Sequence, residues 1–278
     1  MIVLELILFF LSTIIISVAI AGFGSLLSSK TVNNFFLDIC FGLIIISIII
    51  TTIHFFYVIE SFFKFLILLI GLIIFFRKKN LVNYKLLIKK KNFFYLVIIG
   101  FLIPMFVSQK YHEDFGYYHL PYALAFLEEK IVFGFANIDK TFVYNSIWLN
   151  LYPIFFLEDK NYNYLTFPSF LLFLSFIIFS IDKILKQGYS KISNYYLTIV
   201  LFYFLLKFTR ISEFGVDFPA TIFAILSIFY FIKFYETNEI IERKSFFYFN
   251  LAFSLFSILI KLSAVSYTHL TLPTNSRV

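Results

Sequence analysis

Long apolar blocks constrain this chain more than any other feature of its sequence. Eight of them are found, at about 2–21, 35–56, 62–76, 93–107, 168–181, 195–208, 219–234 and 246–264. A helix that crosses the hydrocarbon core of a bilayer needs about 20 apolar residues, and it satisfies its backbone hydrogen bonds within the segment. The short alternating segments of a transmembrane β-barrel are missing. The pattern therefore predicts an all-α, polytopic transmembrane helical bundle of about eight spans.

Composition and charge point the same way. Hydrophobic residues make up 61% of the 278 residues and charged residues only 14%, whereas a soluble domain carries about 25% charged residues. The formal net charge of +7 comes from basic residues in segments between the apolar blocks, where they set topology. We therefore expect the lipid bilayer as a partner and no nucleic acid.

Basic residues between the third and fourth blocks predict the orientation. Seven lysines and arginines lie between Arg77 and Lys91, with no acid among them. Such a segment stays on the cytoplasmic side. Counting spans from it puts the segments 183–191 and 236–244 on the same side and the N-terminus outside. The expected location is the cytoplasmic (inner) membrane of a bacterium, with multiple passes.

Two segments are then expected outside the membrane, at 108–167 and 209–218. The first is long and rich in aromatic residues, and long connections are usually functional or disordered. It contains two predicted interfacial helices, Pro121–Phe133 and Thr141–Leu157. The second of these helices carries Tyr144, Trp148 and Tyr152 at a spacing of four, hence on one face. That face either lies at the lipid headgroups or is an ordinary packing face.

The first candidate site follows the fourth block and reads Tyr111-His-Glu-Asp-Phe-Gly-Tyr-Tyr-His-Leu-Pro121. A carboxylate at the membrane surface can act as a general base toward a bound hydroxyl, and Gly116 permits a turn that aims Asp114 toward the bilayer. Two alternatives stay open: acids that cap the next helix, or a divalent-cation site with Asp114 and His112 as candidate ligands. Candidates for contacting a substrate are Glu113, Tyr118 and His119.

The second candidate site is the short turn from Arg210 to Pro219, which also contains Glu213 and Asp217. An arginine grips phosphate through its planar fork, so Arg210 and Glu213 are candidates for binding a substrate. The alternative is a capped turn with a structural ion pair. If the fourth and sixth spans are neighbours, Asp114 and Asp217 share one cavity.

These segments resemble a known family. The run from Asp114 to Pro121, the run Leu127-Glu-Glu-Lys-Ile-Val-Phe-Gly-Phe-Ala-Asn137 and the run Phe142-Val-Tyr-Asn-Ser-Ile-Trp148 resemble the first external loop of bacterial GT-C-type membrane glycosyltransferases. The likeness is to a branch with a D-x-x-x-Y-H-L core and a second acidic turn, which Asp217-Phe-Pro219 resembles. It covers roughly Lys110 to Ala224.

The resemblance implies a GT-C-like bundle and a sugar transferase, with a polyprenyl-phosphate sugar donor and an acceptor on the outer side of the membrane. It puts Asp114 in the family's acidic position, as catalytic base or as a ligand of a divalent cation, and makes Asp217 the second acid. Two other functions stay open. One is a non-catalytic membrane scaffold, and the other is a transporter or flippase of lipid-linked glycans.

The sequence divides into three parts. Residues 1–92 hold the N-terminal helices and the basic segment, and residues 93–264 hold the GT-C-like core with the external loop 108–167. Residues 265–278 begin with VSYTHLTLPT, which is the translation of a common sequencing adapter. We interpret this tail as an artefact and expect the natural protein, here truncated at its C-terminus, to continue differently after Ala264.

Overall fold

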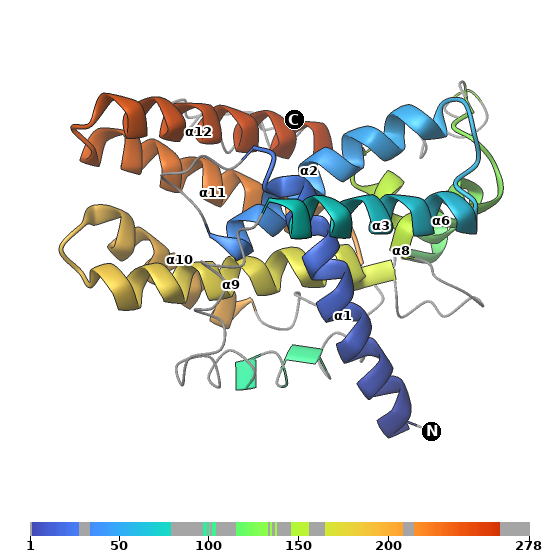
Figure 1. Ribbon diagram of the computed structural model, residues 1–278, viewed down its shortest axis with the longest axis horizontal. Coiled ribbons are helices and arrows are strands. Elements are labelled where there is room, and N and C mark those ends of the chain that lie inside the picture. Colours follow the sequence, from blue (N-terminus) through green and yellow to red (C-terminus); the bar gives the residue numbers. More distant parts are fainter. Residues whose placement is uncertain are drawn as a thin grey trace, which may run out of the picture.

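The computed structural model describes residues 2–27, 34–78, 97–98, 100, 102–103, 115–132, 134, 137, 146–155, 165–207 and 214–261. Every regular element in these ranges is helical and none is a strand. The long helices are α1 (Ile2–Gly24), α2 (Phe35–His54), α3 (Ser61–Arg77), α9 (Phe167–Gln187), α10 (Ile192–Leu206), α11 (Asp217–Glu236) and α12 (Ile240–Ile260). Between α3 and α9 lie a π-helical turn (Phe115–His119), α6 (Leu120–Glu128), a 3-10 turn (Leu149–Leu151) and α8 (Tyr152–Phe155) (Figure 1).

Within the described residues, three helices are long and apolar enough to cross a membrane: α2, α9 and α11. Helix α10 and the part of α1 from Phe10 to Gly24 are apolar but shorter. Large apolar side chains also face outward, such as Leu206, which is 85% exposed, and Ile199, which is 68% exposed. Lipid tails can cover such side chains, whereas water solvates them poorly. The apolar helices indicate a membrane-embedded helical protein, as the sequence predicts.

Helices α1, α2 and α3 pack closely because glycines line their contacts. A Cβ atom at Gly42 of α2 would collide with the carbonyl group of Ile20 in α1, and one at Gly71 of α3 would collide with that of Ala19. Small residues let helix backbones approach one another in a membrane, where close packing replaces the hydrophobic driving force. These glycines therefore hold the first three helices together.

Helices α9 to α12 form two hairpins whose cores are aromatic. Figure 1 shows the α9–α10 turn and the α11–α12 turn side by side at the left of the view. Phe223 of α11 packs edge-on against Phe256 of α12, with ring centroids 4.9 Å apart, and polar contacts add to this packing. Ser227 donates to the Oδ1 atom of Asn250 over 2.5 Å. Phe41 of α2 stacks on Phe253 of α12 at 4.7 Å, which joins the two halves of the bundle.

Polar contacts between the helix ends lie at two opposite ends of the bundle. Residues Asn34, Asp182, Gln187, Ser193 and Lys233 meet at one end, where Asn34 and Asp182 lie 3.5 Å apart and Lys233 donates to Gln187. We call this the lysine end. At the other end, which we call the Asp217 end, Asn150 donates to Thr51 over 2.9 Å and the backbone of Ile147 donates to Leu259.

Several boundaries differ from those predicted. Helix α6 ends at Glu128, five residues before the predicted Phe133. Where 141–157 is described, a 3-10 turn and the short α8 replace the predicted continuous helix. Trp148 and Tyr152 are fully buried, so they form a packing face, the alternative to a stripe at the headgroups. Most of the predicted span 93–107 lies outside the described residues.

Candidate functional site

Most of the predicted site residues cannot be placed. His112, Glu113, Asp114, Arg210 and Glu213 lie outside the described residues. The backbone of Tyr118 and His119 belongs to the π-helical turn, but their side chains lie outside the description as well. Asp217 is described fully, so the geometry of the site starts from that residue and from the neighbours of the others.

Asp217 is the first residue of α11. An acid in the first turn is favourable there because the N-terminus of a helix carries a partial positive charge. The carboxylate forms an ion pair with the ammonium of Lys261, just after α12, and the Asp217 side chain remains 75% exposed. The sequence also allows a structural ion pair within the turn from Arg210 to Pro219. The partner of Asp217 lies instead just after α12, and most of the carboxylate stays exposed.

An aromatic cluster joins the two candidate segments at the Asp217 end. The ring of Phe115, which follows Asp114 in the chain, lies 5.2 Å from that of Phe214, which follows Glu213. The ring of Phe214 also lies 4.7 Å from that of Tyr152, and all three side chains are buried. The structure therefore brings together the residues that directly follow Asp114 and Glu213.

Helix α6 lies beside this cluster and is amphipathic. It buries Ala123 and Phe126 and exposes Glu128. The segment after it is tied to α2, because the Nε2 atom of His54 lies 2.9 Å from the carbonyl oxygen of Glu129. The backbone of Ile131 also donates to the carbonyl oxygen of His54 over 3.0 Å.

Two tyrosines near the site are held in the neutral form. Burial raises the pKa of Tyr122 to about 12, and burial also raises the pKa of Tyr152 well above its usual range. A general base works best when its pKa lies near the working pH. Neither hydroxyl can therefore act as a base near neutral pH.

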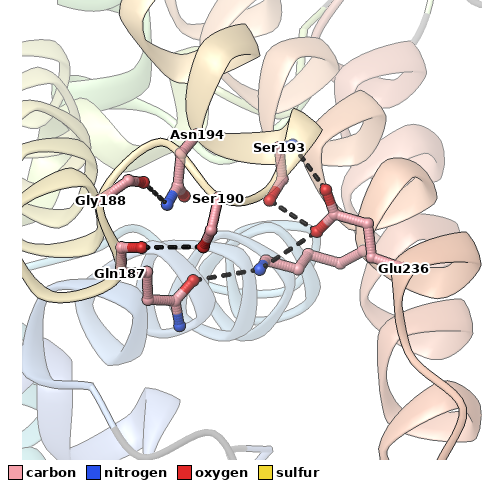
Figure 2. A network of polar contacts seen from close by, with 7 residues as sticks. Gln187, Gly188, Ser190, Ser193, Asn194 and Glu236 are labelled. Atoms are coloured by element: carbon pink, nitrogen blue, oxygen red, sulfur yellow. Dashed lines mark hydrogen bonds and ion pairs between the residues drawn. The ribbon is translucent and has the colours of Figure 1, made fainter.

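The lysine end holds a polar network that the sequence reasoning missed. Lys233 lies 3.3 Å from the carboxylate of Glu236 and donates to Gln187 over 3.2 Å. Glu236 in turn accepts from both the backbone N–H and the hydroxyl of Ser193, each over 2.7 Å. Asn194 donates to the carbonyl oxygen of Gly188 beside it. Figure 2 shows these groups joining the ends of α9, α10 and α11.

A signal for this network was present in the sequence. Lys233 interrupts the apolar run of α11 three residues before Glu236, and an ionisable residue inside such a run usually has a partner and often a function. From the sequence alone, the basic residues at 183–191 indicate only topology. Their proximity to Lys233 could not be foreseen, because it depends on how the two hairpins pack.

Within the part of the chain that the structure describes, no group of three or more His, Cys, Asp or Glu side chains could hold a metal ion. The predicted ligands Asp114 and His112 lie outside that part.

Comparisons with known proteins complete this description. Neither the curated proteins nor the solved structures contain a match to this chain. One family model matches residues 2–277, a range that includes both ends of the bundle and both candidate segments. The chain belongs to the family described as Domain of unknown function (DUF8201).

Proposed function

We propose that this protein is a GT-C-like membrane glycosyltransferase that works at the Asp217 end of the bundle. It takes a sugar from a polyprenyl-phosphate donor and transfers it to an acceptor hydroxyl. The proposal includes the eight-span topology with the N-terminus outside, so that the Asp217 end faces away from the cytoplasm. The resemblance of residues 110–224 to GT-C enzymes suggests this chemistry.

The observation that carries the proposal is the contact between Phe115 and Phe214. It links the residue after Asp114 to the residue after Glu213, in a buried cluster beside α6 and three residues from Asp217. Phe115 and Phe214 are about 100 residues apart in sequence, so their contact supports a shared site for the two acidic segments. Paired carboxylates on a shared site are a common arrangement for glycosyl chemistry, at separations up to about 10 Å.

In the proposed reaction Asp114 accepts the proton of the acceptor hydroxyl. The acceptor oxygen forms a bond with the anomeric carbon, while the bond from that carbon to the phosphate oxygen breaks. The phosphate leaves with the electron pair, and Arg210 stabilises its negative charge. Asp217 is the second acid, and Glu113, Tyr118, His119 and Glu213 contact the substrates. In a metal-dependent variant of this mechanism, Asp114 and His112 would hold a divalent cation.

The test compares Asp114→Asn with the wild-type protein. The substitution keeps the shape of the side chain but removes the base, so the rate should fall by about 10²–10⁴-fold. Arg210→Lys loses the bidentate grip on phosphate and should also slow transfer. The assay follows radiolabelled sugar in membranes that contain polyprenyl-phosphate-linked donors, together with the release of free polyprenyl phosphate.

Glu128→Gln is the matched control, because Glu128 is exposed on α6 and should be silent. Unchanged transfer by Asp114→Asn would remove the catalytic assignment. Equal losses in all three variants would indicate a folding effect instead. Movement of the labelled lipid across the membrane without release of polyprenyl phosphate would favour the transporter, and neither signal in the wild type would favour the scaffold.

A further inference from the structure

A cavity opens at the lysine end, on the far side of the bundle from Asp217. Asp217 begins α11 and Lys233 lies sixteen residues later, which is about 24 Å along the helix at 1.5 Å per residue. The cavity has a volume of about 130 Å³ and lies between the ends of α9, α10, α11 and α12. It is therefore separate from the site proposed for sugar transfer.

Three lysines from different parts of the chain line this cavity: Lys183 of α9, Lys191 before α10 and Lys233 of α11. Glu242 is the one acid among the lining residues that the structure describes. The buried rings of Phe229, Tyr230 and Phe246 line it as well. The surface of the cavity is mostly polar, and the three rings supply its smaller apolar part.

The positive charges of these three lysines are not equally compensated by nearby acids. Lys233 is nearly buried and has the carboxylate of Glu236 as its partner, but that carboxylate is also fixed by Ser193. Neither Lys183 nor Lys191 forms an ion pair with any described acid within 4 Å. Both repel the ammonium of Lys233, while Glu242 attracts Lys183 and Lys233, and Asp182 attracts Lys183. The three ammonium groups therefore exceed the nearby carboxylates of Glu236 and Glu242 by one positive charge, which a bound anion would offset.

Donor groups remain for such an anion. An ammonium has three N–H donors, and Glu236 and Gln187 account for two of those of Lys233. Lysine is a common ligand of phosphate, as a point charge. A volume of about 130 Å³ is well above the roughly 10–15 Å³ that a cavity needs to hold one water, so the cavity has room for a small anion such as phosphate.

The surroundings of the cavity are those of a membrane surface. Ile192 follows Lys191 directly, and Ile240 and Ile241 precede Glu242 directly. These three side chains are between 70% and 74% exposed, so lipid tails can cover them. Basic pockets between membrane helices at this level of the bilayer suit anionic headgroups.

We propose that this cavity is a binding site for a phosphate group, presented either by an anionic lipid headgroup or by a soluble phosphate. The ammonium groups of Lys183, Lys191 and Lys233 surround the phosphate. Where the source is a lipid, its tails run over Ile192, Ile240 and Ile241. The site does not depend on the sugar transfer proposed for the opposite end.

The test uses the purified full chain in detergent and native mass spectrometry. Dioctanoyl phosphatidate is titrated in one arm, and dioctanoyl phosphatidylcholine, which has no net charge, in another. A third arm adds inorganic phosphate as a competitor. We expect phosphatidate to bind more tightly than phosphatidylcholine. Competition at similar concentrations identifies the soluble source, and its absence identifies the lipid.

Lys183→Gln with Lys191→Gln removes two charges that have no close acid partner. A lysine near an anionic surface contributes about 1 kcal/mol, which is about fivefold, so phosphatidate should bind about 25-fold more weakly. Lys186→Gln with Lys244→Gln is the matched control, because these two exposed lysines lie at the same end but outside the cavity lining. Its affinity should change by less than about twofold, since the effect of exposed charges is small.

Replacing Lys183 and Lys191 with arginine keeps the charge and should preserve binding, which separates a loss of charge from a loss of fold. The proposal is overturned if the wild-type protein binds neither phosphatidate nor inorganic phosphate. It is equally overturned if the glutamine variant and its control lose the same affinity.

Discussion

Ion pairs occur at both ends of α11, in opposite surroundings. At the Asp217 end, Asp217 and Lys261 have side chains that are 75% and 40% exposed. At the lysine end, the side chains of Lys233 and Glu236 are only 7% and 11% exposed, and Ser193 and Gln187 fix them from two further helices. The same pairing of an acid with a lysine therefore occurs in one exposed and one buried setting.

The difference shows where chemistry can occur. The Glu236 carboxylate accepts two hydrogen bonds from Ser193 and faces Lys233, so its oxygens are occupied and its geometry is fixed. The Asp217 carboxylate has one lysine partner at the surface, which water or a substrate can displace at little cost. Glu236 is thus held in a buried network, whereas the carboxylate of Asp217 is exposed.

The largest expected effect is at the buried pair. Glu236→Ala leaves the ammonium of Lys233 almost buried without its acid, and it removes the acceptor of Ser193. Breaking a buried ion pair by removing one partner lowers the free energy of unfolding by about 3–5 kcal/mol. We expect a loss near 3 kcal/mol, because Gln187 still accepts from Lys233. Unfolding in mixed detergent micelles with increasing dodecyl sulfate measures it.

Glu239→Ala is the control for this variant, because Glu239 is exposed three residues further on and its side chain makes no capping hydrogen bond. Its free energy of unfolding should change by less than about 0.5 kcal/mol. If Glu236→Ala and Glu239→Ala lower the free energy of unfolding equally, the buried pair contributes no special stability. The lysine end would then not differ from the Asp217 end in this respect.

An intermediate effect is expected at Ser193. Ser193→Ala removes the hydroxyl that donates to Glu236 but leaves the backbone N–H in place. A hydrogen bond to a charged group contributes about 1.5–3 kcal/mol, so the loss should be about 1.5 kcal/mol in the same unfolding experiment. Ser190→Ala removes an exposed hydroxyl nearby and should be nearly silent. A silent Ser193→Ala would show that the backbone N–H alone fixes Glu236.

The helices themselves could be predicted from the sequence. The predicted blocks at 35–56, 62–76 and 219–234 differ from α2, α3 and α11 by at most two residues at each end, because apolar run length decides where a membrane helix can form. The start of α12 was predicted six residues late. Glu242, Arg243 and Lys244 looked like a polar connection, yet they form the first turns of that helix.

The partners across the bundle could not be predicted. Nothing in the sequence pairs Glu236 with Ser193 or Asp217 with Lys261, since both contacts depend on how α10, α11 and α12 pack. Trp148 and Tyr152 show the same limit. Their spacing suits a headgroup face or a packing face equally, and only the contact of Trp148 with Ser169 of α9 and the burial of Tyr152 decide for packing. The role of Asp114 as catalytic base stays a prediction.

The smallest effect on stability is expected at the exposed pair, and this prediction tests the comparison most sharply. Asp217→Asn removes a charge whose side chain is 75% exposed, so the free energy of unfolding should change by no more than about 0.5 kcal/mol. A double-mutant cycle with Lys261→Gln should give a coupling of about 0.2–1 kcal/mol, and salt at about 1 M should reduce it by screening.

If Asp217 is the second acid of a sugar transferase, the Asp217→Asn variant should slow transfer by about tenfold or more in protein that folds normally. Lys261→Gln has the same small effect on stability and serves as the matched control, because its ammonium has no role in the proposed reaction. A loss of more than about 2 kcal/mol in Asp217→Asn would make this carboxylate structural, like that of Glu236. The contrast between the two ends would then disappear, and Asp217 would no longer be a candidate for chemistry.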